Sequence, residues 1–329
     1  GAALPRQKTD FLPALLPALV ALAALPFVSP STWLTLTVAG LAMGMMIFIM
    51  ASGLTLVFGL MDVLNFGHGA FIAIGAYLAT LVLAPMASYM QADSLPTNLA
   101  ALVPAVLLAA GVTGVLGLAF ERVLIRPVYG QHLKQILITM GGMIVAEQLL
   151  YALWGPQQIP LPLPTSLRGA FIIGDAAVEK YRLLAVVVGL VVFVAMMIVL
   201  NRTKIGLLIR AGVENGEMVE AMGYRVRRLF VGVFMAGSAL AGLGGVMWAL
   251  YREQVNAMMG GELMVLVFIV VIIGGLGSVG GCFIGALLVA LLANYAGFLL
   301  PKMALVSDIL LMVAVLLWRP RGLYPVATR

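Results

Sequence analysis

Residues 263–299 read LMVLVFIVVIIGGLGSVGGCFIGALLVALLANYAGFL and contain no charged side chain. A helix that spans a bilayer needs about 20 mostly apolar residues, so this stretch is too long for one span. The glycine-rich segment 274–281 interrupts it. Irregular backbone inside a membrane is tolerated where protein or a cavity surrounds it. The sequence therefore predicts two helices, 263–278 and 281–299, with a short or re-entrant pair around 274–281.

The composition of the whole chain is that of a membrane protein. Of its 329 residues, 63% are hydrophobic and 10% are charged. A typical soluble domain has about 45–50% apolar and about 25% charged residues. Because the surface of a soluble protein needs polar cover, a chain of this size could not hide so much apolar area. We expect an all-α integral membrane protein.

Apolar segments of spanning length recur along the rest of the chain. They lie near 11–28, 36–59, 64–86, 99–120, 135–154, 183–200, 230–250 and 304–318. Together with the glycine-interrupted pair, they predict about ten membrane segments. The two long connections are 155–182, which begins with several prolines, and 201–229. No stretch is typical of a separate soluble domain, so residues 1–329 are predicted to form a single transmembrane domain.

The basic residues predict the orientation, because cytoplasmic loops are enriched in Lys and Arg. With the N-terminus inside and alternating spans, most of the 19 basic residues lie on the inner side: Arg6, Lys8, Arg122, Arg126, Lys134, Arg202, Lys204, Arg210, Arg225, Arg227, Arg228, Arg319, Arg321 and Arg329. The outer side holds Arg168, Lys180, Arg182, Arg252 and Lys302. We expect both termini in the cytoplasm, with 201–229 inside and 155–182 outside. The positive charge is therefore explained by membrane topology. Nucleic-acid binding would need a continuous basic face, and the sequence predicts none.

Several kinds of chemistry are excluded by residue counts. Cys282 is the single cysteine, which rules out an intrachain disulfide or a cysteine metal cluster. His68 and His132 are the only histidines, too few for a multi-histidine metal site. Residues 275–280 match the pattern G-x-G-x-x-G, but membrane segments flank them and the required acid about 20 residues later is missing. We expect no cofactor in this chain and no ATP hydrolysis by it.

The inner loop 201–229 offers a candidate docking element. A short helix over 214–222 would have Glu214, Glu217 and Glu220 near its start and Gly223 as its C-terminal stop. Arg225 follows the helix end, where basic charge is favourable. Ala221, with its methionine neighbours, supplies an apolar face. The pattern alone leaves two alternatives, a docking helix that moves the spans or a solvated connector.

Candidate pathway residues are the polar and glycine positions inside the apolar segments. Their full set is Asn65, His68, Glu147, Gly275, Gly277 and Ser278. The spacing predicts that Asn65 and His68 share a helix face, either as a hydrogen-bonded structural lock or as part of a gate. Glu147 is the clearest intramembrane acid, and such residues are functional candidates by default. Small residues at positions such as Gly40 and Gly44 predict helix packing.

Five blocks in order carry a family resemblance. They are Gly53 to Tyr77 with its Asn65-Phe66-Gly67-His68 core, Glu121-Arg122 with Arg126-Pro127, Ile205-Gly206 through Gly223, Gly274 to Ser278, and Arg319 to Leu323. From about residue 36 to 325 the chain resembles the permeases of branched-chain amino acid ABC importers, the LivH-type subunit more than its LivM-type partner. The resemblance implies the type II importer fold and a bacterial inner (plasma) membrane location. It also makes 201–229 the coupling segment.

The resemblance implies partners as well. These are a second, LivM-type permease, two cytoplasmic ATPase subunits that bind ATP and magnesium, a periplasmic substrate-binding protein and the membrane lipid. An alternative is an ion-coupled secondary transporter, which predicts intramembrane ion ligands and inverted repeats. We find no convincing repeat in the sequence. Branched-chain amino acids, urea, amides and aromatic or organic acids all remain open as substrates.

Overall fold

A computed structural model describes residues 10–326, apart from the side chain of Val213. The predicted basic residues Arg6, Lys8 and Arg329 lie outside this range. The α-helices are α1 (Leu12–Ala24), α2 (Pro30–Met61), α3 (His68–Leu83), α4 (Ala87–Gln91), α5 (Leu95–Phe120), α6 (His132–Trp154), α7 (Lys180–Arg202), α8 (Lys204–Glu214), α9 (Gly216–Ala221), α10 (Val226–Arg252), α11 (Met259–Gly274), α12 (Val279–Leu299) and α13 (Ser307–Trp318).

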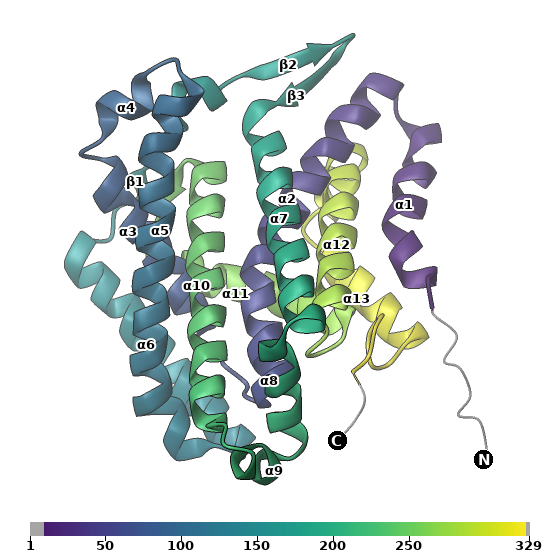
Figure 1. Ribbon diagram of the computed structural model, residues 1–329. Helices are drawn as coiled ribbons and strands as arrows, with labels where there is room; N and C mark the ends of the chain where they lie inside the picture. The colour runs from purple at the N-terminus through teal and green to yellow at the C-terminus, as the bar shows by residue number, and fades with distance from the viewer. Residues whose placement is uncertain (1–9, 327–329) are drawn as a thin grey trace.

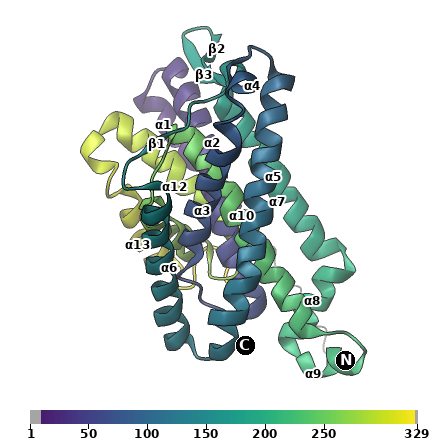
Figure 2. The same cartoon turned by 90° about the vertical axis from the view of Figure 1, so that its left-hand side faces the viewer.

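Short helices and strands lie between the long helices. The short helices are η1 (Leu25–Phe27), the π-type η2 (Glu121–Ile125), η3 (Arg126–Val128), η4 (Thr165–Leu167) and η5 (Pro301–Met303). The strands are β1 (Ile159–Pro160), β2 (Ala170–Ile173), β3 (Ala176–Glu179) and β4 (Gln254–Val255), paired antiparallel as β2–β3 and β1–β4. In both views the β2–β3 hairpin and α9 lie at opposite ends of the helix bundle (Figures 1 and 2). We call these ends the hairpin end and the α9 end.

An apolar helix occupies each of the ten predicted segments. Six helical segments within residues 10–326 are long and apolar enough to cross a membrane, and four shorter apolar helices accompany them, Leu12–Phe27, His68–Leu83, Met259–Gly274 and Ser307–Trp318. The chain is therefore a mostly helical, multi-pass membrane protein. The predicted boundary at 278 was wrong, because α11 already ends at Gly274 and the break runs from there to the start of α12.

Helix α2 is the centre of the bundle, and α10 and α12 run antiparallel to it. It is the most buried of the six long helices, whereas α6 and α7 are the least buried. A Cβ atom built on Gly53 would lie 2.2 Å from the Gly237 carbonyl oxygen, and one built on Gly237 would lie 2.8 Å from the Gly53 carbonyl. The α2 and α10 backbones therefore touch. The predicted packing glycines Gly40 and Gly44 meet Leu291 and Leu287 of α12 in the same way, inside this chain.

The fold contains two copies of one unit, which the sequence reading missed. Each unit is a long helix, a non-helical linker and a short helix of 16 residues: α2 with α3, and α10 with α11. Asp62 ends α2 and Glu253 ends α10, and they are the only non-glycine residues of the described chain with positive φ, 56° in each. Because α2 and α10 are antiparallel, the two units are inverted relative to each other.

The two linkers, 62–67 and 253–258, share their turn chemistry. Asn65 Oδ1 accepts from the Gly67 amide at 2.9 Å, and Asn256 Oδ1 accepts from the Met258 amide at 3.0 Å. A turn of this kind, in which an asparagine side chain accepts a hydrogen bond from the backbone two residues later, competes with the hydrogen bonds of a helix. Asn65 therefore precedes α3, and the prediction that it shares a helix face with His68 was wrong.

The two short helices begin against each other. A Cβ atom on Gly69 of α3 would lie 2.5 Å from the Gly260 carbonyl oxygen, and one on Gly260 of α11 would lie 2.1 Å from the Gly69 carbonyl. His68 and Gly53 meet beside this contact, since a Cβ atom on Gly53 would lie 2.8 Å from His68 Cε1. The linkers thus bring α3 and α11 to a common point alongside the middle of α2.

The C-terminal segment closes the glycine break. The Leu323 amide donates to the Ile273 carbonyl at 2.8 Å, and the Tyr324 amide donates to the Gly274 carbonyl at 3.1 Å. The Tyr324 hydroxyl donates to the Asp10 carbonyl at 2.8 Å. Arg319 pairs with the Asp10 carboxylate at 2.6 Å and holds the pKa of that carboxyl below its usual range. The two ends of the described chain therefore meet on one side of the bundle.

The α2–α10 contact gives a direct test of the packing. We expect Gly53→Ala to destabilise the protein by about 1–3 kcal/mol or more, because the new methyl group overlaps a backbone oxygen that cannot rotate away. Gly111→Ala in α5 is the matched control, since no atom lies within 4 Å of a Cβ built there. Thermal unfolding in detergent measures both. Equal melting temperatures for the two variants would contradict the contact.

Candidate functional site

The loop 201–229 folds into two helices at one end of the molecule. Thr203 caps α8, with Oγ1 accepting from the Gly206 amide at 3.4 Å. Asn215 caps α9, with Oδ1 accepting from the Met218 amide at 3.1 Å. The predicted short helix is thus present, but it covers 216–221 and not 214–222. Glu214 is the last residue of α8, a helix that the sequence reading did not predict.

Gly223 ends α9 as the sequence predicted. Its φ is +95°, a conformation that glycine adopts without strain. The Gly223 amide donates to the Glu220 carbonyl at 3.0 Å, and the Tyr224 amide donates to the Val219 carbonyl at 3.2 Å. This pair of bonds is the Schellman motif, which satisfies carbonyls at a helix end. Lys204 stacks over the Tyr224 ring at 5.1 Å and ties the end of α9 back to α8.

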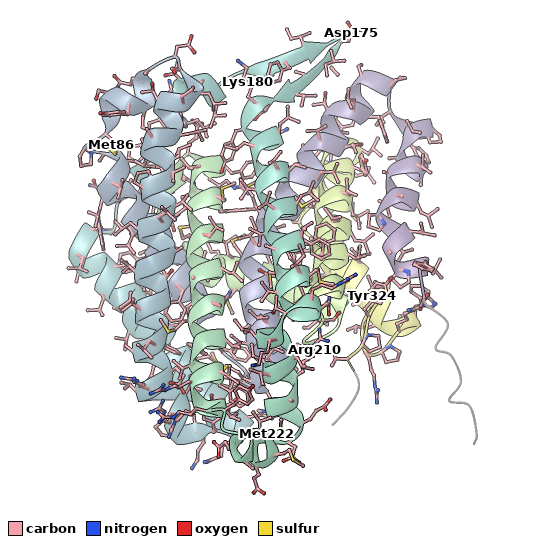
Figure 3. All side chains as sticks on the ribbon, viewed as in Figure 1. Met86, Asp175, Lys180, Arg210, Met222 and Tyr324 are labelled. Atoms are coloured by element: carbon pink, nitrogen blue, oxygen red, sulfur yellow. The ribbon has the colours of Figure 1, made fainter. Side chains whose placement is uncertain are left out.

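The outer face of α9 is free within the described chain. Val219 anchors the helix and is 4% exposed. Met218 and Met222 are 58% and 69% exposed, and Met222 lies at the tip of the α9 end (Figure 3). All six residues predicted for coupling are exposed: Glu214, Glu217, Glu220, Ala221, Gly223 and Arg225. The arrangement is an anchored helix that presents acids and methionines outward, a surface suited to a protein partner.

The α8–α9 pair is held on the first turn of α10. A Cβ atom on Gly212 or Gly216 would lie 3.4 or 4.0 Å from Val226 Cγ1. Val226 is buried between them. At the other side, a Cβ atom on Gly206 would meet the Leu200 carbonyl oxygen at 2.5 Å, so α8 turns closely against the end of α7. The α8–α9 pair is therefore packed against both α7 and α10.

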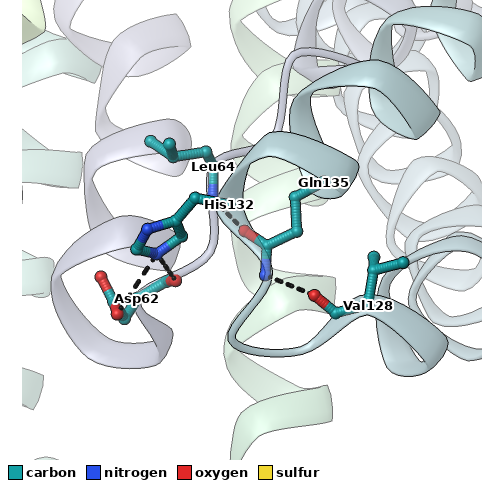
Figure 4. A network of polar contacts seen from close by, with 5 residues as sticks. All are labelled: Asp62, Leu64, Val128, His132 and Gln135. Atoms are coloured by element: carbon teal, nitrogen blue, oxygen red, sulfur yellow. Dashed lines mark hydrogen bonds and ion pairs between the residues drawn. The ribbon is translucent and has the colours of Figure 1, made fainter.

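The linker 62–67 is fastened by α6, as Figure 4 shows. His132 Nε2 donates to the Asp62 carbonyl at 3.2 Å and lies 3.3 Å from its carboxylate. Gln135 Oε1 accepts from the Leu64 amide at 3.2 Å, and its Nε2 donates to the Val128 carbonyl at 3.0 Å. These bonds pair backbone groups that a membrane interior would leave unsatisfied.

Thr139 completes the same α6 face and accepts from the Phe66 amide at 3.0 Å. Gln135 and Thr139 are fully buried, and sequence reasoning missed both. The sequence signal that could have revealed them is the spacing of the polar residues at 132, 135 and 139. Residues three and four apart lie on one face of a helix, and this helix is otherwise apolar.

Asn65 and His68 are both buried and bonded to backbone. His68 Nε2 donates to the Met50 carbonyl of α2 at 2.7 Å, and Asn65 makes the turn described above. The geometry favours the structural-lock alternative over a gate for these two residues. Met50 lies near the middle of α2, so His68 fixes the depth at which α3 begins.

The glycine break contacts α2 nearer its C-terminal end. Gly275 and Gly277 have positive φ values of 103° and 86°. The Gly277 amide donates to Thr55 Oγ1 at 3.0 Å, and Ser278 caps α12 by accepting from the Gly281 amide at 3.0 Å. Leu276, between these residues, lines a cavity of about 500 Å³ together with Asp62, Arg321 and residues of α2, α11 and α13. The glycine break therefore packs tightly against α2 and also forms part of the wall of this cavity.

Glu147 lies apart from the other candidates, on α6, and is partly exposed. The described residues provide it no ion pair. Glu121 is far more buried, at 1% exposure, and Arg126 lies 3.4 Å from its carboxylate across the π-type turn. Burial raises the pKa of Tyr129, and the charge of Glu121 adds to the rise while Arg126 and Arg227 oppose it. The sequence reading used Glu121 only as part of the family resemblance.

We expect Gln135→Leu to lower the stability of the protein by about 1–3 kcal/mol, because it leaves the Leu64 amide unpaired and removes one of the two hydrogen bonds to the Val128 carbonyl. Gln148→Leu on the exposed side of α6 removes an amide without a described partner and is the control. Thermal unfolding and the monodisperse fraction after purification provide the readout. A Gln135→Leu variant as stable as the control would show that α6 does not fasten the linker.

Comparison with known proteins agrees with these features. Residues 36–317 match the family described as "Branched-chain amino acid transport system / permease component". The permease protein BraD of Pseudomonas aeruginosa, named for high-affinity branched-chain amino acid transport, is 28% identical over 87% of this chain and 94% of its own length. The similarly named LivH of Escherichia coli K12 is 26% identical over 86% and 92%. The probable LivH of Methanocaldococcus jannaschii is 24% identical over 84% and 88%.

No solved structure matches the chain significantly. The family match covers most of the chain, including most of α2, the whole of α3, α10 and α11, and the loop that carries α8 and α9. The chain belongs to the permease components of branched-chain amino acid ABC transport systems, and it is a transport subunit and not an enzyme.

Proposed function

We propose that this chain forms half of the membrane pathway of an ATP-driven importer whose substrates are branched-chain amino acids. The substrate class rests on the names of its relatives, which are high-affinity branched-chain amino acid permeases. The observation that carries the coupling mechanism is the anchored, outward-facing α9 with its acids and exposed methionines. A helix of this kind receives motion from a partner, since its buried side is joined to the membrane helices.

A movement imposed on α9 by a partner would have a continuous route of contacts to the membrane helices. Motion of α8 and α9 acts on Val226 at the start of α10. Helix α10 touches α2 backbone to backbone at Gly53 and Gly237, so the two helices cannot slide independently without loss of packing. The linkers of both units then transmit the movement to α3 and α11. A packed, contiguous route of this kind supports coupling to a motor outside the membrane.

The proposed membrane arrangement has about ten segments, the six long helices and the four shorter apolar ones, in a type II importer fold with α9 in the cytoplasm. Asp10 and Tyr324 contact each other, which supports both termini on one side. The basic residues around α8, α9 and the start of α10 support a cytoplasmic α9 end. By the family resemblance, the membrane is the bacterial inner membrane.

The proposed assembly contains a second, LivM-type permease, two ATPase subunits beneath α9 and a periplasmic binding protein at the hairpin end. Membrane lipid surrounds the permease pair. ATP and magnesium would be held by the ATPases, and this chain would hold no cofactor. Helix α6 is weakly buried and carries Glu147 and Gln148, which supports a position toward the partner permease and the pathway.

An ion-coupled secondary transporter remains the rival function, and the family does not favour it. The inverted units of this chain do not distinguish the two, because transporters of several mechanisms are built from repeats. Transport by the purified chain alone, with an ion gradient and no ATP, would falsify the proposal.

Docking of the ATPase subunits on α9 is tested by reversing the charge of one exposed acid on that helix. We expect Glu217→Arg to reduce co-purification of the ATPase subunits by roughly tenfold, about the effect of one lost or repelled interface charge. Asp175→Arg at the hairpin end makes the same charge change on an exposed residue and should leave co-purification unchanged. Gly223→Pro, whose φ of +95° proline cannot adopt, should release the end of α9 and weaken binding as well. Equal ATPase recovery from all variants contradicts docking at α9.

Orientation is tested by labelling with a membrane-impermeant maleimide. Cys282 is fully buried, so the natural thiol need not be removed. We expect Met222→Cys to react only in inside-out vesicles and Asp175→Cys only in intact spheroplasts, because the two residues lie at opposite ends of the molecule. The reverse pattern would place α9 outside the cell and exclude its contact with a cytoplasmic ATPase.

A further inference from the structure

A groove lies on the side of the bundle that α7, α8 and α10 form, beside the α9 end. Its volume is about 590 Å³, and α2 and α5 complete its wall. Val199 and Ile205 at its margin are exposed, while Val233 and Ile209 deeper in are buried. The groove therefore opens on the outer surface of the helix bundle.

The shape of the groove fits a chain-like molecule. It follows α10 from Arg228 to Leu243, which corresponds to roughly 22 Å at a rise of about 1.5 Å per residue. The hydrocarbon of one bilayer leaflet is about 15 Å deep, half of the 30 Å core. The groove is therefore long enough for the acyl chain of a lipid in that leaflet.

The lining is apolar except at one end. Arg228 is the only charged residue among the described lining residues, and the others are alanine, glycine, valine, leucine, isoleucine and methionine. No ion pair between described residues involves Arg228. An unpaired guanidinium binds a phosphate through two parallel hydrogen bonds. The groove thus joins a long apolar channel to one free phosphate-binding group.

We propose that this groove binds one phospholipid from the leaflet on the α9 side, with an acyl chain between α7 and α10 and the phosphate on Arg228. Ile205 and Ile209 of α8 contribute to the wall, so the bound lipid also supports the helix that precedes α9. This inference is independent of the transported substrate. It depends on the chain being embedded in a membrane, which its family and helices establish.

The test uses the full chain, purified in detergent, delipidated and titrated with phosphatidylglycerol, with bound lipid counted by native mass spectrometry. We expect one phosphatidylglycerol per chain at the tightest site. Arg228→Gln should weaken this binding by roughly tenfold, since it removes the charge-assisted contact.

Arg227→Gln is the matched control. Arg227 does not line the groove, and its charge acts on Tyr129 next to α6 instead. The lipid affinity of Arg227→Gln should stay within about twofold of the wild type. Salt screens exposed charges, and many basic residues share the non-specific attraction of anionic lipid to the surface, so the loss of one has a small effect. Equal losses for both variants would mean non-specific attraction to a basic surface and would overturn the proposal.

A second pair of variants tests the apolar part. Ala239→Phe fills the groove and should remove the tight lipid. Val191→Phe adds a ring of the same kind to the exposed surface of α7 outside the groove and should leave the lipid bound. Retention of the lipid by Ala239→Phe would overturn the proposal. It would also be overturned if the wild type bound no lipid and Ala239→Phe changed the oligomeric state, because the groove would then bind another protein chain. Arg228 is exposed, so Arg228→Gln tests the proposal even if the phenylalanine variant does not fold.

Discussion

The constraint on which this structure depends is the pairing of backbone hydrogen-bonding groups where water is absent. A regular helix satisfies its own groups, but this chain interrupts its helices at 62–67, 253–258 and 275–278. At the first interruption, side chains of α6 reach the linker. At the second, Leu161 and Leu163 of the proline-rich loop donate to the Glu253 carbonyl and carboxylate, next to the β1–β4 pair. At the third, Thr55 and the C-terminal segment supply the partners. Each break is thus matched by a distant segment: α6, the loop 155–182, and Thr55 with residues 323 and 324.

The two inverted units follow from the same constraint. In each unit an acid in the left-handed conformation ends the long helix, and an asparagine three residues later forms the turn. The sequence therefore carries the pattern acid-x-x-Asn-x-x-x-Gly twice, at 62–69 and 253–260. The shared glycine allows Gly69 and Gly260 to meet. The remaining positions of the two stretches differ, because one linker packs against α6 and the other beneath the outer loop.

Much of the fold could be predicted from the sequence, because apolar length and charge placement are local properties. All ten apolar segments contain a helix, and the glycine break and the Gly223 stop are where the pattern put them. What sequence reasoning missed depends on contacts between distant segments. The role of Gln135 and Thr139 is visible only once 62–67 lies beside α6, and the break at Gly274 is set by pairing with residues 323 and 324. For the candidate sites, the short helix in 201–229 and its end at Gly223 were predicted, whereas Asn65 was placed on a helix that begins three residues later. The roles of Glu147 and of the glycine break in transport stay predictions.

The pairing of residues 323 and 324 with Ile273 and Gly274 has a consequence for how the protein is made. A ribosome synthesises membrane segments in order, and the Ile273 and Gly274 carbonyls at the end of α11 are made some fifty residues before the amides that pair with them. During that interval these two carbonyls lack the partners that they have in the folded chain. The glycine break can reach its final form only after residues 323 and 324 have been synthesised. A chain that stopped before residue 323 would leave the end of α11 without this seal.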